Sequence, residues 1–351
     1  MFRLDPAALA KAAALPDLSV LDGSSILVTG ASGLVGSAFA ELLFARAIAG
    51  ARVGIFLAGR SEGTLRARFA DIPAPWTFVP FDAQAPWRCD RRFDFILHAA
   101  APAHPTAIME RPADTLRAIV SGTSSVLAHA AATGARRVLF VSSSEVYGIL
   151  PGKETPWRED EIGEIDTLSP RSCYSQGKRA AETLCAAAAE QDGTDVVIAR
   201  PGHVYGPTAT ASDSRAHAEF ARAAASGKPI VLRSAGLQLR SYCHAIDCAT
   251  AFAALFARGE KSRAYNVPGP AEPVTIRRMA EAFAAAGGVE IIRETPTAED
   301  SRRANPMPTS ALEPSRLASL GWRSVYDMDS GAADTVVRMR NTGIERSDIL
   351  W

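Results

Sequence analysis

Three features are missing from the sequence, and each absence excludes a class of protein. No stretch of about 18 uncharged apolar residues is present, which argues against a helix that spans a membrane. The 38 basic and 38 acidic side chains cancel and no basic run stands out, so neither nucleic acid nor an anionic membrane is an expected partner. Five cysteines without a C-x-x-C pair favour reduced, buried thiols over disulfides or a metal site. We expect a cytoplasmic protein.

The segment Ile26–Gly36 carries a pattern typical of a nucleotide-binding turn. A run of aliphatic residues stops at Gly30, further glycines follow at three-residue spacing, and an amphipathic helical pattern begins at Leu34. Glycines let the backbone approach a pyrophosphate closely, and the N–H groups that open the helix face its charge. We therefore expect cofactor contacts from Gly30, Ser32, Gly33, Leu34, Val35 and Gly36.

Strand patterns alternate with helix patterns as far as Arg200. Further strands are expected at 52–57, 76–82, 92–100, 137–142 and 195–200, with long helices at about 112–133 and 173–191. This alternation predicts an α/β fold of the Rossmann type, a doubly wound parallel sheet with right-handed crossovers. Beyond Pro201 a pattern broken by proline and glycine predicts a smaller C-terminal lobe that binds the substrate.

The expected domain limits follow from these patterns. Residues 1–23 form an N-terminal extension, and residues 24–205 form the dinucleotide-binding domain. A helix and a strand within 241–268 return to that domain, whereas 206–240 and 269–351 form the lobe.

The residues after the second expected strand bear on the choice of cofactor. Dinucleotide folds often carry an acidic residue there for the ribose hydroxyls, but this chain has Arg60 and Ser61. Because these side chains can hold a 2′-phosphate, NADP is favoured over NAD, the alternative being a solvated arginine.

The ends of the third and fourth expected strands carry further candidate residues. Asp82 ends the third strand and is expected near the adenine, and the small residues Ala99 and Ala100 leave room for the middle of the cofactor. His98 ends a buried strand without an evident acidic partner, so we expect it to be structural.

Two segments carry the chemistry expected of a proton-transfer site. Ser142–Gly148 closes the fifth strand, and Tyr174 and Lys178 stand four residues apart at the start of a helix, on one face. An ammonium near a phenol favours the phenolate, which removes a proton from an alcohol while hydride leaves its carbon. Ser143 is expected to hydrogen-bond the same substrate oxygen.

Together these motifs resemble the extended short-chain dehydrogenase/reductases of the NAD-dependent epimerase/dehydratase family, over about residues 24–322. The matching segments are Thr29–Gly36, Ser142–Gly148, Tyr174–Lys178, Arg200–Pro201, Tyr205–Pro207, Arg240–Tyr242 and Asp247. The resemblance implies a Rossmann domain, a lobe that binds a nucleotide sugar, and a Ser-Tyr-Lys catalytic set. It also implies a homodimer through the helices that begin near Pro112 and Cys173.

Within that family, Ser144–Gly148 and Pro170–Glu182 are most similar to UDP-glucuronate decarboxylases, in which a glutamate at the position of Glu145 accompanies the tyrosine. The adjacent Asp and Glu of the 4,6-dehydratases are replaced by Ser144 and Glu145. The chain departs from the family at Ile119 and His203, where asparagine is usual, and at Ser301–Asn305.

The resemblance assigns roles by position. Tyr174 is the base, Lys178 lowers its pKa and binds the nicotinamide ribose, and Ser143 polarises the reacting hydroxyl. Glu145 is a second acid/base or orients water. Arg200 and His203 are expected at the cofactor, Arg240 clamps the sugar diphosphate because a guanidinium matches phosphate oxygens, and Tyr242, Arg302 and Arg303 contact the substrate.

The expected reaction is transient oxidation of a UDP-sugar at C4 followed by loss of carbon dioxide from C6. Two alternatives use the same site: 4-epimerisation, and net reduction of a 4-keto sugar by NADPH. A scaffold that only senses the dinucleotide is the non-enzymatic alternative, although such a protein is expected to have lost the base.

Overall fold

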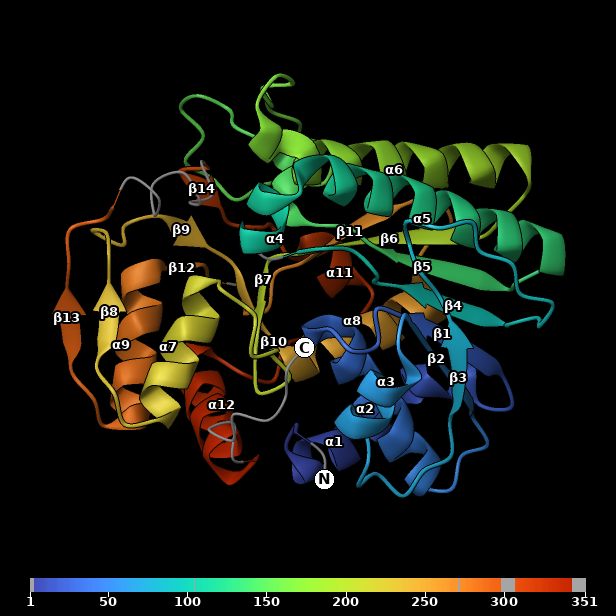
Figure 1. Cartoon of the computed structure of the whole chain (residues 1–351), viewed down its shortest axis with the longest axis horizontal. Coiled ribbons are helices and arrows are strands. Elements are labelled where there is room, and N and C mark those ends of the chain that lie inside the picture. Colours follow the sequence, from blue (N-terminus) through green and yellow to red (C-terminus); the bar gives the residue numbers. More distant parts are fainter. Residues whose placement is uncertain (1–2, 104, 271, 298–306, 343–351) are drawn as a thin grey trace.

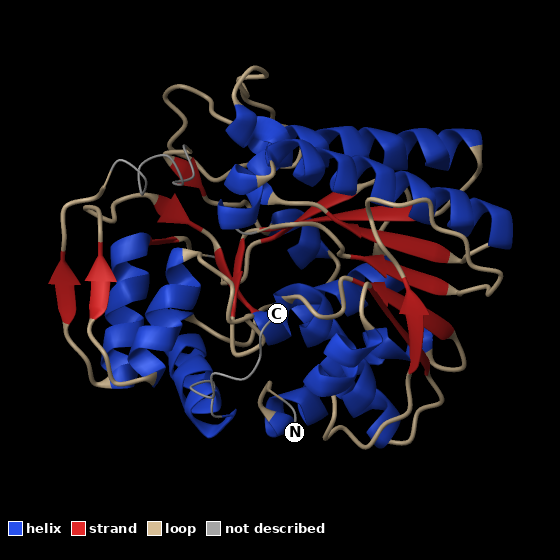
Figure 2. Ribbon diagram, viewed as in Figure 1, coloured by secondary structure: helices blue, strands red, loops and turns tan. Residues whose placement is uncertain are grey.

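The computed structural model of the protein describes residues 3–103, 105–270, 272–297 and 307–342. A seven-stranded sheet lies between two layers of helices, and a smaller lobe adjoins it (Figures 1 and 2). The predicted class, a doubly wound α/β fold with a parallel sheet, is confirmed.

All neighbouring strands of the central sheet are parallel, in the order β11-β6-β5-β4-β1-β2-β3. The strands are β1 (Ser25–Thr29), β2 (Gly54–Gly59), β3 (Thr77–Pro80), β4 (Phe95–His98), β5 (Arg137–Val141), β6 (Val196–Pro201) and β11 (Ala264–Val267). Ile26, Leu27 and Val28 of β1 are fully buried because helices cover both faces. The strand order reverses between β1 and β4, so ligands are expected at the carboxyl ends of these strands.

Helices cover the two faces of the sheet unequally (Figure 1). On one face lie α5 (Pro112–Thr133) and α6 (Cys173–Gln191), and on the other α2 (Leu34–Ile48), α3 (Glu62–Arg68) and α8 (Ala245–Arg258). Proline in the first turn and Gly134 in the left-handed region, with φ 68°, set the limits of α5. Between α2 and α8, the ring of Phe39 lies 5.7 Å from that of Phe256.

The N-terminal segment packs against this second layer. It contains α1 (Pro6–Ala13) and a 3₁₀ helix (Pro16–Leu21). The buried carboxylate of Glu41 on α2 accepts the backbone N–H of Leu4 at 2.9 Å, and Asp17 pairs with Arg258 of α8. The segment therefore braces the two helices.

The lobe is built on three helices that pack together and three small groups of strands. The helices are α7 (Ala216–Ala225), α9 (Ile276–Gly287) and α12 (Met328–Thr342). The strands are β7 (His203–Tyr205) with β10 (Tyr242–His244), β8 (Ile230–Leu232) with β13 (Ile291–Arg293), and β9 (Leu239–Arg240) between β12 (Val274–Thr275) and β14 (Thr309–Ser310). Two short helices are α4 (Pro105–Glu110) and α11 (Ser315–Ser319).

Two further features of the structure concern its helices and its cysteines. Among the described helices, none is both long and apolar enough to cross a membrane. All five cysteines are unpaired, and four of them are buried.

Candidate active site

The turn between β1 and α2 has no room for side chains at two of its glycines. Gly30 has φ 68°, and a Cβ there would lie 2.7 Å from the carbonyl carbon of Ala99. A Cβ on Gly36 would lie 2.3 Å from the carbonyl oxygen of Gly30. No side chain caps the N-terminus of α2 at Gly33, so its first N–H groups are open to an anion. The turn that contains Ser32, Leu34 and Val35 therefore fits a dinucleotide diphosphate.

Thr29 joins the ends of β1 and β4. Its hydroxyl accepts the backbone N–H groups of Ala99 and Ala100 at 3.2 and 3.3 Å and lies 2.8 Å from Nδ1 of His98. Nε2 of His98 lies 3.3 Å from the hydroxyl of Thr123. Burial lowers the pKa of His98 to about 3, so the imidazole is neutral and structural, as predicted.

No acidic residue directly follows β2. Arg60 is exposed, and the hydroxyl of Ser61 accepts the N–H of Thr64 at 3.3 Å as the N-cap of α3. Asp82, after β3, is also exposed and accepts the N–H of Gln84 at 3.0 Å. Ser61 thus serves the helix, which leaves Arg60 as the charged side chain at this strand end.

Three of the expected catalytic side chains come together at the carboxyl end of β5. Nζ of Lys178 lies 5.9 Å from the centre of the Tyr174 ring and donates to the carbonyl oxygen of Val141 at 2.6 Å. Ser143 hydrogen-bonds Tyr174, and its hydroxyl accepts the N–H of Glu145 at 3.2 Å. The serine, tyrosine and lysine therefore form one group, in which Tyr174 and Lys178 are buried and Ser143 is partly exposed.

The electrostatics of the tyrosine differ from the expectation. Burial raises the pKa of Tyr174 to about 12 and the charge of Glu145 adds to the rise, whereas the hydrogen bond with Ser143 and the charge of Arg215 oppose it. Burial lowers the pKa of Lys178 to about 8. The net shift of Tyr174 is upward because desolvation outweighs the effects that favour the phenolate, and a lowering of this pKa by Lys178 stays a prediction.

Glu145 has a partner that the sequence reasoning missed. Its carboxylate accepts two hydrogen bonds from Arg171, at 2.9 and 3.0 Å, and both side chains are largely buried. Nε of Arg171 is buried without a hydrogen-bond partner. Arg171 stands three residues before Tyr174 in the sequence. This closeness to the Tyr-Lys motif is the one feature from which its place in the site could have been predicted.

The sequence reasoning also missed Arg215, a second cation, which belongs to the lobe. Arg215 is partly buried and donates to Asp213 at 2.9 Å. Burial opposes its charge, while Asp213, Tyr174 and Glu145 favour it, and the net effect raises the pKa of Arg215. Arg215 therefore faces the catalytic group from the start of α7.

Arg240, which is expected to bind the diphosphate of the substrate, is only 3% exposed to solvent. Its guanidinium donates to the backbone carbonyls of Leu239, Met307 and Pro308 at 2.9, 2.8 and 3.2 Å. Within the part of the chain that the structure describes, no carboxylate pairs with it. Tyr242, two residues later, is also buried, and burial raises its pKa above the ordinary value.

Arg200 is engaged in a structural network. Its guanidinium donates to both carboxylate oxygens of Glu182 at 2.9 and 2.7 Å, to the hydroxyl of Tyr147 at 3.1 Å and to the carbonyl of Glu159 at 3.0 Å. These bonds use most of its donors and link β6, α6 and the loop after β5, and a contact of Arg200 with the cofactor stays a prediction.

His203 lies among the lobe residues. Its ring is 5.6 Å from that of Tyr242, and its Nε2 is 3.2 Å from the hydroxyl of Ser310 on β14. The structure thus groups His203 with the expected substrate residues and not with the cofactor turn.

The sequence profile of the NAD dependent epimerase/dehydratase family matches residues 26–268. The chain belongs to this family.

Relatives and solved structures agree with the assignment. UDP-glucuronic acid decarboxylase 1 of Xenopus tropicalis is 30% identical over 321 residues, which cover 91% of this chain and 73% of the relative. The NAD complex of UDP-glucose 4-epimerase from Thermus thermophilus is 25% identical, with a TM-score of 0.73 over 90% of this chain and 99% of that one. The dTDP-glucose 4,6-dehydratase DesIV from Streptomyces venezuelae, with NAD and TYD bound, shares the fold at 24% identity, with a TM-score of 0.75 over 90% and 97% of the two chains.

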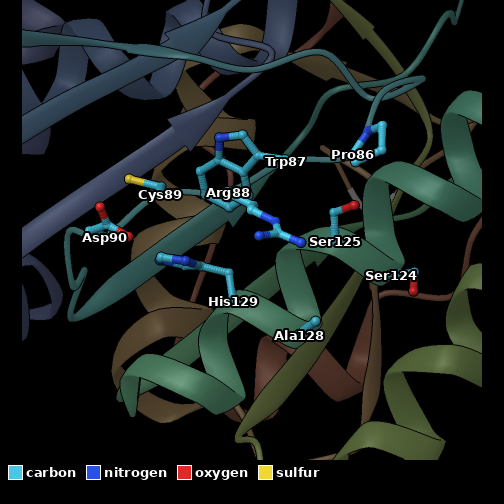
Figure 3. Close-up of a pocket in the computed structure, with 9 residues that line it drawn as sticks. All are labelled: Pro86, Trp87, Arg88, Cys89, Asp90, Ser124, Ser125, Ala128 and His129. Atoms are coloured by element: carbon cyan, nitrogen blue, oxygen red, sulfur yellow. The ribbon is translucent and has the colours of Figure 1, made fainter.

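Two expected substrate residues of this family member, Arg302 and Arg303, lie outside the described residues. A hollow lies between the loop 86–90 and α5 (Figure 3). His129 and Trp87 line it with ring centres 4.7 Å apart. The hollow contains none of the expected site residues.

Proposed function

We propose that the protein decarboxylates UDP-glucuronate through transient oxidation of the sugar at C4. The observation that carries the proposal is the group of Ser143, Tyr174 and Lys178 at the carboxyl end of β5, beside the Glu145–Arg171 pair. The 30% identity with a UDP-glucuronic acid decarboxylase over most of both chains supports this substrate.

The proposed cofactor is NADP, with NAD as the alternative. The glycine turn holds its diphosphate, and Arg60 binds the 2′-phosphate by charge-assisted hydrogen bonds. When bound, the nicotinamide supplies a reversible acceptor for the hydride of C4. Lys178 would hold the nicotinamide ribose.

Tyr174 takes the proton of the C4 hydroxyl, and Ser143 orients that oxygen through a hydrogen bond. The resulting 4-keto sugar is a β-keto acid, which loses carbon dioxide from C6. The carbon that remains takes a proton from solvent, through a water molecule that the Glu145 carboxylate, held by Arg171, would orient. Tyr174 then returns its proton when C4 is reduced again.

The charges around this group suit an acidic sugar. Three guanidinium groups, those of Arg171, Arg215 and Arg240, act on or pair with Glu145, and Asp213 is the carboxylate that pairs with Arg215. This surplus of positive charge favours a substrate with a carboxylate and a diphosphate.

The proposal is tested by incubating the purified protein with UDP-glucuronate and either NADP or NAD, while carbon dioxide and the sugar nucleotide are measured by mass spectrometry. Carbon dioxide and a UDP-pentose are expected. Consumption of added NADPH in step with product would indicate a net reductase, and no change in the sugar would contradict the proposal.

A 4-epimerase is the second candidate, because the 25% identical relative is a UDP-glucose 4-epimerase and epimerisation begins with the same oxidation at C4. UDP-galacturonate without carbon dioxide would support it in the same assay.

We also propose a homodimer through α5 and α6, whose outer sides carry small residues and Leu116, which is 38% exposed. Light scattering is expected to give twice the chain mass for the wild type and the single chain mass for Leu116→Glu. A monomeric wild type would contradict the proposal.

A further inference from the structure

Segment 206–215, which joins β7 to α7, has two buried ends and an exposed middle. Thr208 near one end and Asp213 near the other are buried. Ala211 and Ser212, which lie between them, are exposed. The position of the segment is therefore set by what holds its two ends.

The first attachment joins the segment to the cofactor turn. The hydroxyl of Thr208 donates to the carbonyl oxygen of Leu34, the first residue of α2, at 3.0 Å. One guanidinium nitrogen of Arg68 on α3 donates to the carbonyl oxygen of Thr208 and to the hydroxyl of Ser37, both at 2.6 Å. Thr208 is therefore fixed to the helix whose N-terminus is open to the diphosphate of a dinucleotide.

The second attachment joins the segment to α4, which follows β4. The hydroxyl of Ser214 lies 2.8 Å from that of Thr106 on α4. Asp213, the preceding residue, pairs with Arg215, and its carbonyl oxygen accepts a hydrogen bond from Arg222 of α7 at 2.7 Å. The end at 213–215 is therefore held by both α4 and α7.

The two attachments lie on either side of the point where a dinucleotide is expected. The helix α2 follows β1 and α4 follows β4, and the strand order reverses between these two neighbouring strands. The carbonyl oxygen of Ile108 on α4 lies 3.9 Å from Sγ of Cys173, the residue before Tyr174. The segment therefore runs from the diphosphate end of the cofactor crevice toward its catalytic end.

We propose that segment 206–215 is a strap across the dinucleotide crevice, and that Thr208 and Ser214 are positioning residues that keep it closed. While both attachments are made, a bound dinucleotide leaves only after one end of the strap has been released. The strap acts on the dinucleotide whichever sugar the protein converts.

The test measures how fast bound NADPH or NADH leaves the full chain, from its fluorescence after mixing with an excess of the oxidised dinucleotide. Thr208→Val keeps the shape of the side chain and removes the hydroxyl, and Ser214→Ala removes the partner of Thr106. Because each variant loses one hydrogen bond, we expect each to release the dinucleotide about 3- to 10-fold faster than the wild type. Association rates should change less than about twofold.

Two further variants separate the attachment from a general loss of stability. Thr208→Ser keeps the hydroxyl and should release the dinucleotide at the wild-type rate. Thr335→Val makes the matched change at another fully buried threonine, whose hydroxyl donates to the carbonyl oxygen of Gly331 within α12 at 2.7 Å. Its release rate should equal that of the wild type, whatever its melting temperature.

The double variant Thr208→Val with Ser214→Ala tests whether the two attachments act as one strap. Since the crevice opens once either end is free, the double variant should be no more than about twofold faster than the faster single variant. The strap is overturned by a double variant whose acceleration is the product of the two single effects, by a wild-type rate in either single variant, or by equal acceleration in Thr335→Val. A wild type that binds neither NADPH nor NADH overturns it as well.

Discussion

The two sides of the site satisfy their polar groups in different ways. On the cofactor side, Lys178 donates to Val141, and His98 lies between the hydroxyls of Thr29 and Thr123. On the lobe side, Arg240 has only backbone carbonyls as partners and Nε2 of His217 has none among the described residues.

This difference shows how each side recognises its ligand. On the cofactor side the polar side chains are hydrogen-bonded within the protein, and the backbone N–H groups at the start of α2 stay open to an anion. The lobe side carries buried positive charge that a ligand must balance. Changes on the two sides should therefore have separable effects.

The largest effect is expected at the base. Tyr174→Phe should lower the rate of carbon dioxide release about 10³-fold, because the phenol hydroxyl that transfers the proton is lost. Dinucleotide binding should persist. Tyr147→Phe is the control, since that hydroxyl donates to Asn266 at 2.6 Å and serves the core. Turnover by Tyr174→Phe within tenfold of the wild type would favour a scaffold or another base.

The second-largest effect is expected at Arg240, and it should distinguish the lobe side of the site from the cofactor side most clearly. Arg240→Gln removes the buried charge and should weaken UDP binding about 100-fold, because the fork of donors matches phosphate oxygens. Dinucleotide affinity should not change. Calorimetry with each ligand measures both, and equal losses for UDP and dinucleotide would contradict the separation.

The third prediction concerns the cofactor side, at the glycine turn between β1 and α2. Gly36→Ala places a Cβ 2.3 Å from the carbonyl oxygen of Gly30, so the backbone must shift. We expect about 1–3 kcal/mol lower stability and the loss of thermal stabilisation by the dinucleotide. Gly33→Ala, whose Cβ would lie 3.3 Å from the same oxygen, should lose less. A reversed order would show that the turn does not set the cofactor site.

A smaller effect concerns the choice of dinucleotide. Arg60→Ala should weaken NADP binding about tenfold and leave NAD binding within about twofold, because in the proposed complex the exposed guanidinium would bind only the 2′-phosphate. Fluorescence titration with both dinucleotides gives the ratio. An unchanged ratio would assign Arg60 to the solvated surface.

The smallest effect is a change in pH dependence. The charge of Glu145 raises the pKa of Tyr174, so Glu145→Gln removes a negative charge and should lower that pKa. The phenolate then forms at lower pH, and the acidic limb of the kcat profile should move to lower pH. Glu164→Gln, an exposed site, should leave the limb in place. A shift to higher pH would contradict this electrostatic account.

The sequence predicts the cofactor side well because its signals are local. The glycine spacing from Gly30 to Gly36 requires one tight strand-to-helix turn, and Tyr174 and Lys178 share a helix face at any tertiary arrangement. The helices α5 and α6 were predicted at 112–133 and 173–191, and the parallel sheet followed from the alternation of strands and helices.

The lobe side could not be predicted in the same way. His203, His217 and Tyr242 come from separate strands and a helix in a stretch broken by proline and glycine, and their grouping depends on how these elements pack. The network of Arg200 and the raised pKa of Tyr174 depend on burial, which spacing in sequence does not report.

The central claim is that the hydrogen removed from C4 returns to C4 of the same sugar. The most direct measurement uses UDP-glucuronate carrying deuterium at C4, with the product analysed by mass spectrometry and NMR. We predict a UDP-pentose that retains deuterium at C4. A product whose C4 hydrogen comes from solvent or from added cofactor would contradict the account.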